Sequence, residues 1–251
     1  SGHAVLQNLL SAGFKGDIFP VNPKCQTLNG LKCYASVGKL PKLPDLTIIV
    51  TPAPIVPGLM KECGKKGIVS VLVLSAGFKE AGETGEALFR DLKAQAKEHG
   101  IRLIGPNCMG LYVPDARLAM MQGQSPESGP VGMVSQSGMN AGEFVRYSAP
   151  RGIRCSKVIS FGNGADLKAA DFLDYLTDDP QTEIIVAYLE GIQDGPRLAR
   201  AIRRAGPRGS ESHRRGGLHL RAAARDGLHG ELRVLVRQIV RAIQGPRRSA
   251  L

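Results

Sequence analysis

The feature that most constrains the fold is a repeated alternation of short apolar runs with segments of helical pattern. Runs rich in Val, Ile and Leu occupy residues 45–50, 69–74 and 101–105, and the stretches between them place apolar residues at helical spacing. Continuous apolar runs indicate strands covered on both faces, and their alternation with helices indicates βαβ units and a parallel sheet. A run at 17–21 is predicted as a further strand of this sheet.

A second set of alternating elements follows residue 130. The stretch 113–130 contains two clusters of proline and polar residues and is predicted as a linker. Beyond it, strands are predicted at 131–135, 156–162 and 182–191, with helices at about 138–151, 167–176 and 194–205. We therefore predict an α/β protein with two consecutive Rossmann-like or flavodoxin-like domains, both built on parallel sheets. The predicted divisions are 1–120, 121–205 and a tail, 206–251.

The positive charge of the chain is confined to its last part. The formal net charge is +11, yet residues 1–196 carry 19 basic and 19 acidic side chains, while residues 197–251 carry 14 arginines and 3 acidic residues. The Arg-rich tail is the only support for a nucleic-acid partner, and it has no interleaved aromatic residues or binding motif. We do not expect a nucleic-acid partner and interpret the tail as disordered or artefactual.

Composition narrows the class of protein further. No apolar run approaches the roughly 18–20 residues that cross a bilayer, and the N-terminus lacks the pattern of a secretory signal. The five cysteines are scattered, without a CxxC pair or a histidine at metal-ligand spacing. We expect a cytoplasmic protein with reduced thiols, no metal site and no membrane contact.

Four loops at predicted strand ends combine Pro or Gly with small polar groups. Ligands of open α/β sheets bind at the carboxyl ends of strands, so four such loops in succession favour a nucleotide-type ligand over ordinary turn chemistry. The candidate cofactor-binding residues in these loops are Val21, Asn22, Pro23, Lys24, Thr51, Pro52, Ala53, Ser75, Ala76, Gly77, Asn107 and Cys108.

The second domain carries its own candidate anion site. The sequence Ser135-Gln136-Ser137-Gly138 joins an apolar strand to a helix, where hydroxyls, backbone N–H groups and the helix dipole favour a phosphate. The alternative is a plain serine N-cap. Glu190 ends another strand run; its carboxylate either faces solvent or orients an imidazole through a hydrogen bond.

Seven segments in order carry a family resemblance: "GFKGDIFPVNPK", "LPDLTIIVTPAPIV", "SAGFKEAG", "IRLIGPNCMGL", "VGMVSQSG", "SKVISFGNGADL" and "DDPQTEIIVAYLEGIQDG". Over about residues 1–205 the chain resembles the NDP-forming acyl-CoA synthetases, which include ADP-forming acetyl-CoA synthetase and the succinyl-CoA ligase α subunit. The resemblance implies a CoA-binding Rossmann domain followed by a flavodoxin-like ligase domain. It implies a reaction that interconverts acyl-CoA, phosphate and ADP with a free acid, CoA and ATP through an acyl phosphate and a phosphohistidine.

The resemblance also implies roles for single residues. The loops at residues 21–24 and 51–53 would contact CoA, and Ser75–Gly77 and Asn107-Cys108 remain candidate cofactor-binding residues from their place at strand ends. Residues 135–138 would hold the phosphoryl group, and Glu190 would hydrogen-bond the histidine ring. ATP or ADP, with Mg²⁺, would bind a separate ATP-grasp β-type chain or domain, and the other substrate would be a small carboxylic acid or acyl-CoA.

The sequence departs from the family pattern at both ends. Only Ser1-Gly2 matches the tail of the family's glycine-rich first turn, so the first strand is expected to be missing. The family's histidine loop "SHTG" is matched only at its first two residues, by Ser212-His213. The sequence also becomes Lys-free and Arg-rich, which leads to the hypothesis of a reading-frame change near residues 204–208. On this hypothesis the isolated chain is an inactive fragment.

Two other functions stay open at this stage. A CoA- or acyl-CoA-binding regulatory module would use the same fold without catalysis, and loss of the histidine fits it equally well. An NAD-dependent oxidoreductase is disfavoured, because no intact GxGxxG is present and "VNPK" stands where an acidic residue is expected.

Overall fold

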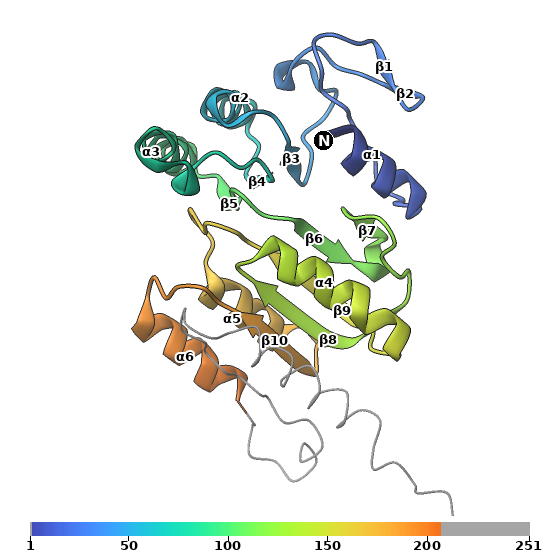
Figure 1. Ribbon diagram of the computed structural model, residues 1–251. Helices are drawn as coiled ribbons and strands as arrows, with labels where there is room; N and C mark the ends of the chain where they lie inside the picture. The colour runs from blue at the N-terminus through green and yellow to red at the C-terminus, as the bar shows by residue number, and fades with distance from the viewer. Residues whose placement is uncertain (1, 207–251) are drawn as a thin grey trace, which may run out of the picture.

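The computed structural model describes residues 2–206, and Figure 1 shows its two main sheets one above the other. The predicted tail 206–251 lies outside the described residues apart from Gly206, and so does the weak candidate His213. Of the region 204–208, for which we hypothesise a reading-frame change, only residues 204–206 are described. Among the helices of the described part, none combines the length and apolarity needed to cross a bilayer.

The first sheet is three-stranded and parallel. Its strands are β3 (Thr47–Ile49), β4 (Ser70–Val73) and β5 (Arg102–Ile104), in the spatial order β3-β4-β5. Helices α2 (Val56–Lys66) and α3 (Gly82–Glu98) cover one face, and α1 (Gly2–Ser11) lies on the other side (Figure 1).

Both faces of this sheet are buried, as the apolar runs predict. Val71 and Val73 pack in the cluster beneath α2 and α3, whereas Leu72 packs in a separate cluster on the opposite face. All three side chains are at most 1% exposed. Alternate residues of one strand therefore fill two different cores, which requires apolar residues at the consecutive positions 71–73.

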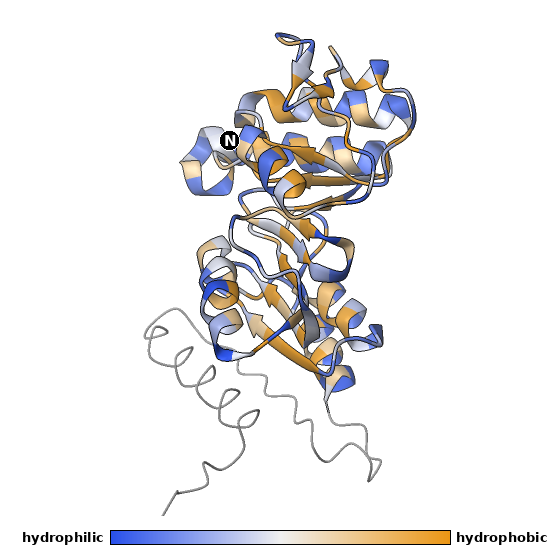
Figure 2. Ribbon diagram, turned by 90° about the vertical axis from the view of Figure 1, so that its right-hand side faces the viewer, coloured by the Kyte–Doolittle hydropathy of each residue, from blue (hydrophilic) through white to orange (hydrophobic). Residues whose placement is uncertain are grey.

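The second sheet is five-stranded, in the order β10-β8-β9-β6-β7. Its parallel centre consists of β8 (Ser128–Ser135), β9 (Cys155–Ser160) and β10 (Ile184–Tyr188). Helix α4 (Gly138–Ser148) packs on one face, and α5 (Ala169–Asp178) and α6 (Gly195–Ala205) pack on the other. Figure 2 shows the strands of both sheets as hydrophobic ribbons inside more hydrophilic helix surfaces.

The segment predicted as a linker is largely structured. Strand β6 (Gly110–Val113) pairs antiparallel with β9, and β7 (Leu118–Ala119) pairs antiparallel with β6. The Pro114–Ala116 turn, closed by Arg117 at a φ of +53°, folds β7 back onto β6. The proline that indicated a linker therefore forms a tight turn inside the sheet, and the parallel sheet gains an antiparallel edge.

The change of sheet falls between β5 and β6, ahead of residue 120, where we predicted the domain boundary. The predicted division into folding units at 1–120 and 121–205 stays a prediction.

The strand predicted at 17–21 is not formed. Only Val21 makes an isolated bridge, to Tyr34, and the chain continues into a hairpin of β1 (Thr27–Leu28) and β2 (Leu31–Lys32). Pro20 and Pro23 flank this bridge, and because proline has no N–H to donate, a ladder cannot extend through either residue.

The carboxyl ends of the two parallel sheets face each other. Asn107 follows β5 and Asn163 follows β9; the Asn107 side-chain amide lies 3.5 Å from the Asn163 side-chain oxygen, and the Asn163 N–H donates to the carbonyl of Pro106 at 2.9 Å. Two further backbone hydrogen bonds join this loop to the first sheet, from Ala165 to Gly105 and from Leu167 to Leu103. The ligand-binding edges of both sheets therefore meet at one place.

Candidate functional site

Three of the four predicted cofactor loops come together at the carboxyl edge of the first sheet. The Ser75 hydroxyl donates to the Thr51 carbonyl at 2.5 Å, and the Asn107 N–H donates to the Ser75 carbonyl at 2.9 Å. Gly77 packs against the loop at Ala53, since a Cβ at Gly77 would lie 3.0 Å from the Ala53 methyl group. Sequence positions more than 50 residues apart thus form one continuous edge.

The fourth loop, residues 21–24, stands apart from the other three. Asn22 is tied to the hairpin through a backbone hydrogen bond from its N–H to the Tyr34 carbonyl at 2.9 Å, and its side-chain oxygen accepts from the Lys24 N–H at 2.9 Å. Val21, Pro23 and Lys24 are exposed. No hydrogen bond among the described residues joins this loop to the sheet edge at Thr51.

Thr51 carries an unused polar group at this edge. Its hydroxyl oxygen is buried and has no hydrogen-bond partner among the described residues. A buried hydroxyl without a partner costs about 1–3 kcal/mol, so such a group is expected to bond to a ligand or a water. This hydroxyl fits the polar requirement of a CoA site at the strand end.

Cys108 is placed differently from its neighbour Asn107. Its thiol is buried and donates to the Val73 carbonyl at 3.4 Å. Burial raises the pKa of the Cys108 thiol to about 12, against a smaller opposing effect of a backbone hydrogen bond from Gly110. The thiol is therefore neutral at ordinary pH and packs beneath the loop.

Glu80 organises the Ser75–Gly77 loop, a role that the sequence analysis missed. One of its carboxylate oxygens accepts from the N–H groups of Gly77 at 2.7 Å and Phe78 at 3.3 Å, and the other accepts from the Asn163 side-chain amide at 2.7 Å. Partial burial acts to raise the pKa of Glu80, but these hydrogen bonds outweigh it and hold the pKa below its ordinary value. The turn is thus stabilised by a carboxylate from its own chain.

Asn163 connects the two halves of the site. Besides its contacts to Glu80, Asn107 and Pro106, its carbonyl accepts from the Gln193 side-chain amide at 3.2 Å. Gln193 lies in the segment before α6, so one asparagine links the first sheet's loops to the end of the second domain. The partners are 30 to 83 residues distant in sequence, which explains why local patterns did not indicate this residue.

The predicted phosphate loop uses its two hydroxyls internally. Ser135 is fully buried, and its hydroxyl donates to the Ser137 carbonyl at 2.6 Å. The Ser137 hydroxyl accepts from the Asn140 N–H at 3.3 Å, so Ser137 is the N-cap of α4, the plainer of the two interpretations. The N–H groups of Gly138 and Met139 find no acceptor among the described residues and stay available to an anion.

Gln136 connects this loop to Glu190. Its side-chain oxygen accepts from the N–H groups of Glu190 at 2.8 Å and Gly191 at 3.1 Å. The structure therefore brings together two features that the sequence analysis predicted separately. The Glu190 residue itself is exposed, and its carboxylate has no hydrogen-bond partner among the described residues.

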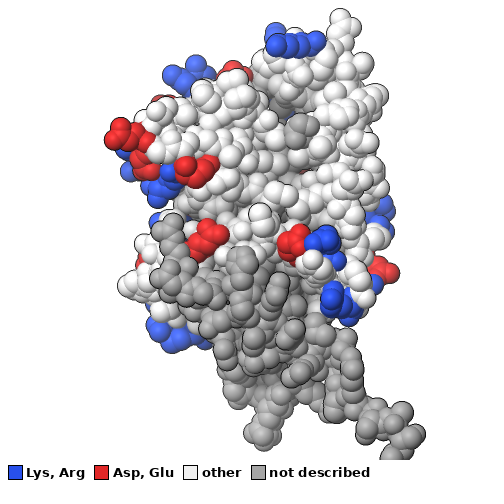
Figure 3. Space-filling model, viewed as in Figure 1, with Lys and Arg blue, Asp and Glu red and all other residues white. Residues whose placement is uncertain are grey.

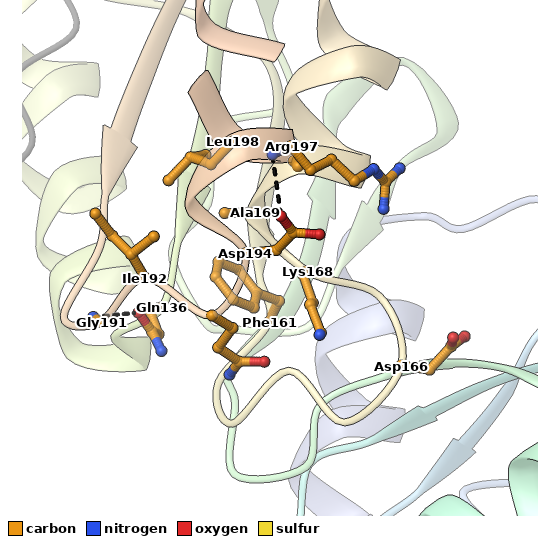
Figure 4. Close-up of a pocket in the computed structure, with 12 residues that line it drawn as sticks. Gln136, Phe161, Asp166, Lys168, Ala169, Gly191, Ile192, Asp194, Arg197 and Leu198 are labelled. Carbon is orange, nitrogen blue, oxygen red and sulfur yellow. Dashed lines mark hydrogen bonds between the residues drawn. The ribbon is translucent and has the colours of Figure 1, made fainter. Parts of the chain in front are cut away.

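A cavity of about 150 Å³ lies at the carboxyl edge of the second sheet, beside Gln136 (Figure 4). Its apolar wall includes Phe161 and Leu198, and its polar residues come from the starts of α5 and α6. The lining residues are Gln136, Phe161, Asp166, Lys168, Ala169, Ala170, Gly191, Ile192, Gln193, Asp194, Arg197 and Leu198. Most of these residues were not predicted, because charged residues near helix starts are common and carry no distinctive pattern.

Two of the four charged residues that line this cavity form ion pairs. Asp166 bonds to Arg102 at 2.9 Å, Arg197 bonds to Asp171 at 2.8 Å, and the Asp194 carboxylate accepts from the Arg197 N–H at 3.0 Å. The ammonium group of Lys168 has no ion-pair partner among the described residues. Asp194 likewise forms no ion pair among the described residues, so the cavity combines one unpaired ammonium group with one unpaired carboxylate, and an anion would bind on its Lys168 side.

On the face shown in Figure 3, the described part of the outer surface has no extended patch of basic side chains. There the described basic and acidic side chains are interspersed over both halves of the chain. The described part of this face thus differs from the extended basic surfaces that bind nucleic acid.

Comparisons with known proteins match both halves of the chain. Residues 1–114 match a CoA binding domain, and residues 128–209 match a succinyl-CoA ligase-like flavodoxin domain. Acetate–CoA ligase (ADP-forming) I of Archaeoglobus fulgidus is 40% identical over 82% of this chain, which covers 30% of that protein. The α subunit of acetate–CoA ligase (ADP-forming) I of Pyrococcus furiosus is 38% identical over 78% of this chain and is covered to 44%.

A solved structure agrees with these relatives. The dinucleotide-forming acetyl-coenzyme A synthetase 1 of Candidatus Korarchaeum cryptofilum, in complex with phosphate and ADP, is 38% identical with a TM-score of 0.75. The match covers 80% of this chain and 44% of that protein. The chain thus spans less than half the length of each of these proteins.

Proposed function

This chain belongs to the NDP-forming acyl-CoA synthetase family, and from that premise we propose that it is the part of such an enzyme that binds CoA and an acyl or phosphoryl anion. The reaction proposed for the whole enzyme interconverts acyl-CoA, phosphate and ADP with a free acid, CoA and ATP. The observation that carries the proposal is the meeting of two carboxyl edges: the loops of the first sheet contact the loop after β9 directly.

The first-sheet edge is the proposed CoA site. Thr51 offers a buried, unused hydroxyl, and the loops at Ser75–Gly77 and Asn107 are held rigidly around it by hydrogen bonds. Lys24 lies on the exposed loop and would approach a phosphate of the cofactor as a point charge. CoA supplies the thiol that accepts the acyl group, while these residues bind and orient it.

The second-sheet edge is the proposed anion site. Lys168 has no ion-pair partner among the described residues, and the N–H groups of Gly138 and Met139 at the start of α4 have no acceptor there. Phosphoryl transfer needs positioned donors and neutralised charge more than an unusual protein nucleophile, and this edge provides both. Gln136 holds the segment at Glu190 beside the cavity, where the exposed carboxylate is proposed to orient a carrier histidine.

The nucleotide is proposed to bind a separate ATP-grasp domain or chain. The Pyrococcus furiosus relative is an α subunit, which supports an arrangement in two subunits. We also propose a small carboxylic acid as the substrate whose acyl group is transferred to CoA.

The test combines the full chain with family polypeptides that supply the carrier-histidine loop and the ATP-grasp domain, adds Mg²⁺-ATP, CoA and acetate, and follows acetyl-CoA by chromatography. The proposal predicts thioester formation that needs both this chain and those polypeptides. Lys168→Met is expected to lower the rate while Lys168→Arg retains most of it, because only the arginine keeps the positive charge. CoA binding with no turnover in any combination would instead support the non-catalytic CoA-binding module and overturn the enzymatic role.

A further inference from the structure

Two thiols lie in contact at the base of the β1–β2 hairpin. The Sγ atoms of Cys25 and Cys33 are 3.4 Å apart, and the Cys33 N–H donates to the Gln26 carbonyl at 2.7 Å, which continues the hairpin pairing. Cys25 is partly exposed, whereas Cys33 is 8% exposed. A partly exposed cysteine is thus in contact with a buried one through their sulfur atoms.

The other three cysteines differ from this pair in both surroundings and chemistry. Cys63, Cys108 and Cys155 are buried in the apolar clusters of the two sheets. Burial raises the pKa of the Cys63 thiol to about 11 and those of Cys108 and Cys155 to about 12, so their reactive thiolate forms are scarce. These three thiols provide an internal reference for reactivity.

We propose that Cys25 and Cys33 form a reversible disulfide when the chain meets a low-molecular-weight disulfide, and that this disulfide controls the adjacent loop at residues 21–24. A disulfide needs the two sulfurs about 1.4 Å closer than the 3.4 Å seen here. The hairpin can supply this movement, because β1 and β2 are each only two residues long and lie at the surface.

The exchange is balanced by the reduction of the oxidant. The Cys25 thiolate attacks one sulfur of the oxidant R–S–S–R, forms a mixed disulfide and releases one thiolate RS⁻. The Cys33 thiol then loses its proton to solvent and attacks Cys25 Sγ, which closes the disulfide and releases the second RS⁻. Burial, followed by the contact with Cys25, raises the pKa of Cys33, so the more accessible Cys25 is the residue that attacks first.

Closing this disulfide changes the contacts of the loop that carries Asn22 and Lys24. In the reduced chain the Cys33 thiol donates to the Asn22 carbonyl at 3.7 Å, and Asn22 in turn accepts from the Lys24 N–H. Oxidation removes the S–H donor and ties Cys25, the residue after Lys24, to the hairpin. If this loop contacts CoA, as the proposed function holds, the oxidised chain binds CoA more weakly.

The test begins with the folded full chain in a series of glutathione disulfide-to-glutathione ratios. Free thiols are blocked with N-ethylmaleimide and the chain is digested with trypsin, which cuts after Lys32, between the two cysteines. A disulfide then joins peptide 25–32 to peptide 33–39. We expect this linked pair to form in the folded chain and to disappear on addition of dithiothreitol. We expect Cys63, Cys108 and Cys155 to carry no glutathione and no disulfide under the same conditions.

Matched variants separate the two steps. Cys33→Ser is expected to accumulate glutathione on Cys25, whereas Cys25→Ser is expected to take up little glutathione because Cys33 is buried. The proposal is overturned if the folded chain gives only mixed disulfides at Cys25, or if the linked pair forms only in denaturant.

The control of CoA binding is measured by titrating CoA into the oxidised and reduced chains. We expect affinity about five-fold weaker after oxidation, the effect of losing roughly one ordinary hydrogen bond in the loop, and no difference in the Cys25→Ser variant, which takes up little glutathione. Equal affinities in fully converted and reduced protein would overturn the control of CoA binding while the linked peptide still establishes the disulfide. No binding of CoA by the reduced chain would instead contradict the proposed function.

Discussion

Replacing Asn163 with Asp tests whether the link between the two halves of the site is energetically important. The substitution preserves size and keeps the oxygen that faces the Asn107 amide, while the backbone groups that bond to Pro106 and Gln193 are unchanged. What changes is the group facing Glu80, where an amide donor 2.7 Å from the carboxylate becomes a second carboxylate. The variant therefore isolates one contact.

The expected cost has two parts. A hydrogen bond to a charged group contributes about 1.5–3 kcal/mol when well shielded, and because Glu80 is exposed we take about 1 kcal/mol. Two carboxylates about 4 Å apart in a solvent-like environment repel by about 1 kcal/mol. Asn163→Asp is thus expected to lower the free energy of unfolding by about 2 kcal/mol near pH 7.

The assay is equilibrium urea unfolding of the full chain, combined with a charge-exchange rescue. Glu80→Gln alone loses the charge and is expected to cost about 1 kcal/mol. The double variant Glu80→Gln/Asn163→Asp places an amide opposite a carboxylate again, with the two groups exchanged. It is expected to recover at least half of the loss caused by Asn163→Asp.

The pH dependence gives an independent check of sign. The pKa of Glu80 is lowered in the folded chain, so its contribution is complete above the unfolded value of about 4.3 and is lost as the pH falls through the lower folded value. In Asn163→Asp the repulsion disappears when one carboxylate is protonated. The difference from wild type should therefore be largest near pH 7 and shrink toward pH 4; a difference that is constant with pH, or a double variant no better than the sum of the single ones, would refute the reasoning.

Three further predictions concern the second domain. Lys157→Met breaks a buried ion pair of 2.7 Å with Asp179. Burial acts to raise the pKa of Asp179, but hydrogen bonds from Lys157 and a threonine outweigh it and lower the pKa. We expect the variant to lose about 3–5 kcal/mol of unfolding free energy in urea at pH 7. Ser137→Ala removes the N-cap of α4 and should cost about 1 kcal/mol in thermal unfolding, with Ser137→Asn close to wild type. Gly162→Ala places a Cβ 2.2 Å from the Asn107 carbonyl oxygen at a φ of +54°, so it should weaken CoA binding in calorimetry as well as stability, by about 1–3 kcal/mol of strain.

The parallel strands could be predicted because their signal is local. The run at 69–74 is apolar at every position except Ser70, and both faces of β4 are indeed buried. The hairpin and the antiparallel edge could not be predicted in the same way, since β6 and β7 together have few residues and depend on pairing with β9. Short strands are defined by their partners more than by their own composition.

In the candidate site, too, the sequence predicted the residues with a local signal and missed those that depend on distant contacts. Loops rich in Gly, Pro and small polar residues indicated the edge at Thr51, Ser75 and Asn107, because turn chemistry is visible in a few consecutive residues. Glu80 and Asn163 are ordinary residues in sequence and acquire a role only through contacts across 83 positions. A single sequence holds no record of such contacts, so the connecting residues emerge from the structure alone.

The most direct test of the account is a calorimetric titration of CoA into the full reduced chain. The account predicts saturable binding at one site per chain, weakened in Thr51→Val, which removes the buried hydroxyl but keeps the shape of the side chain. NAD titrated under the same conditions should give no saturable heat. The absence of saturable CoA binding, or equal affinity in wild type and Thr51→Val, would contradict the assignment of the first sheet's carboxyl edge as the CoA site.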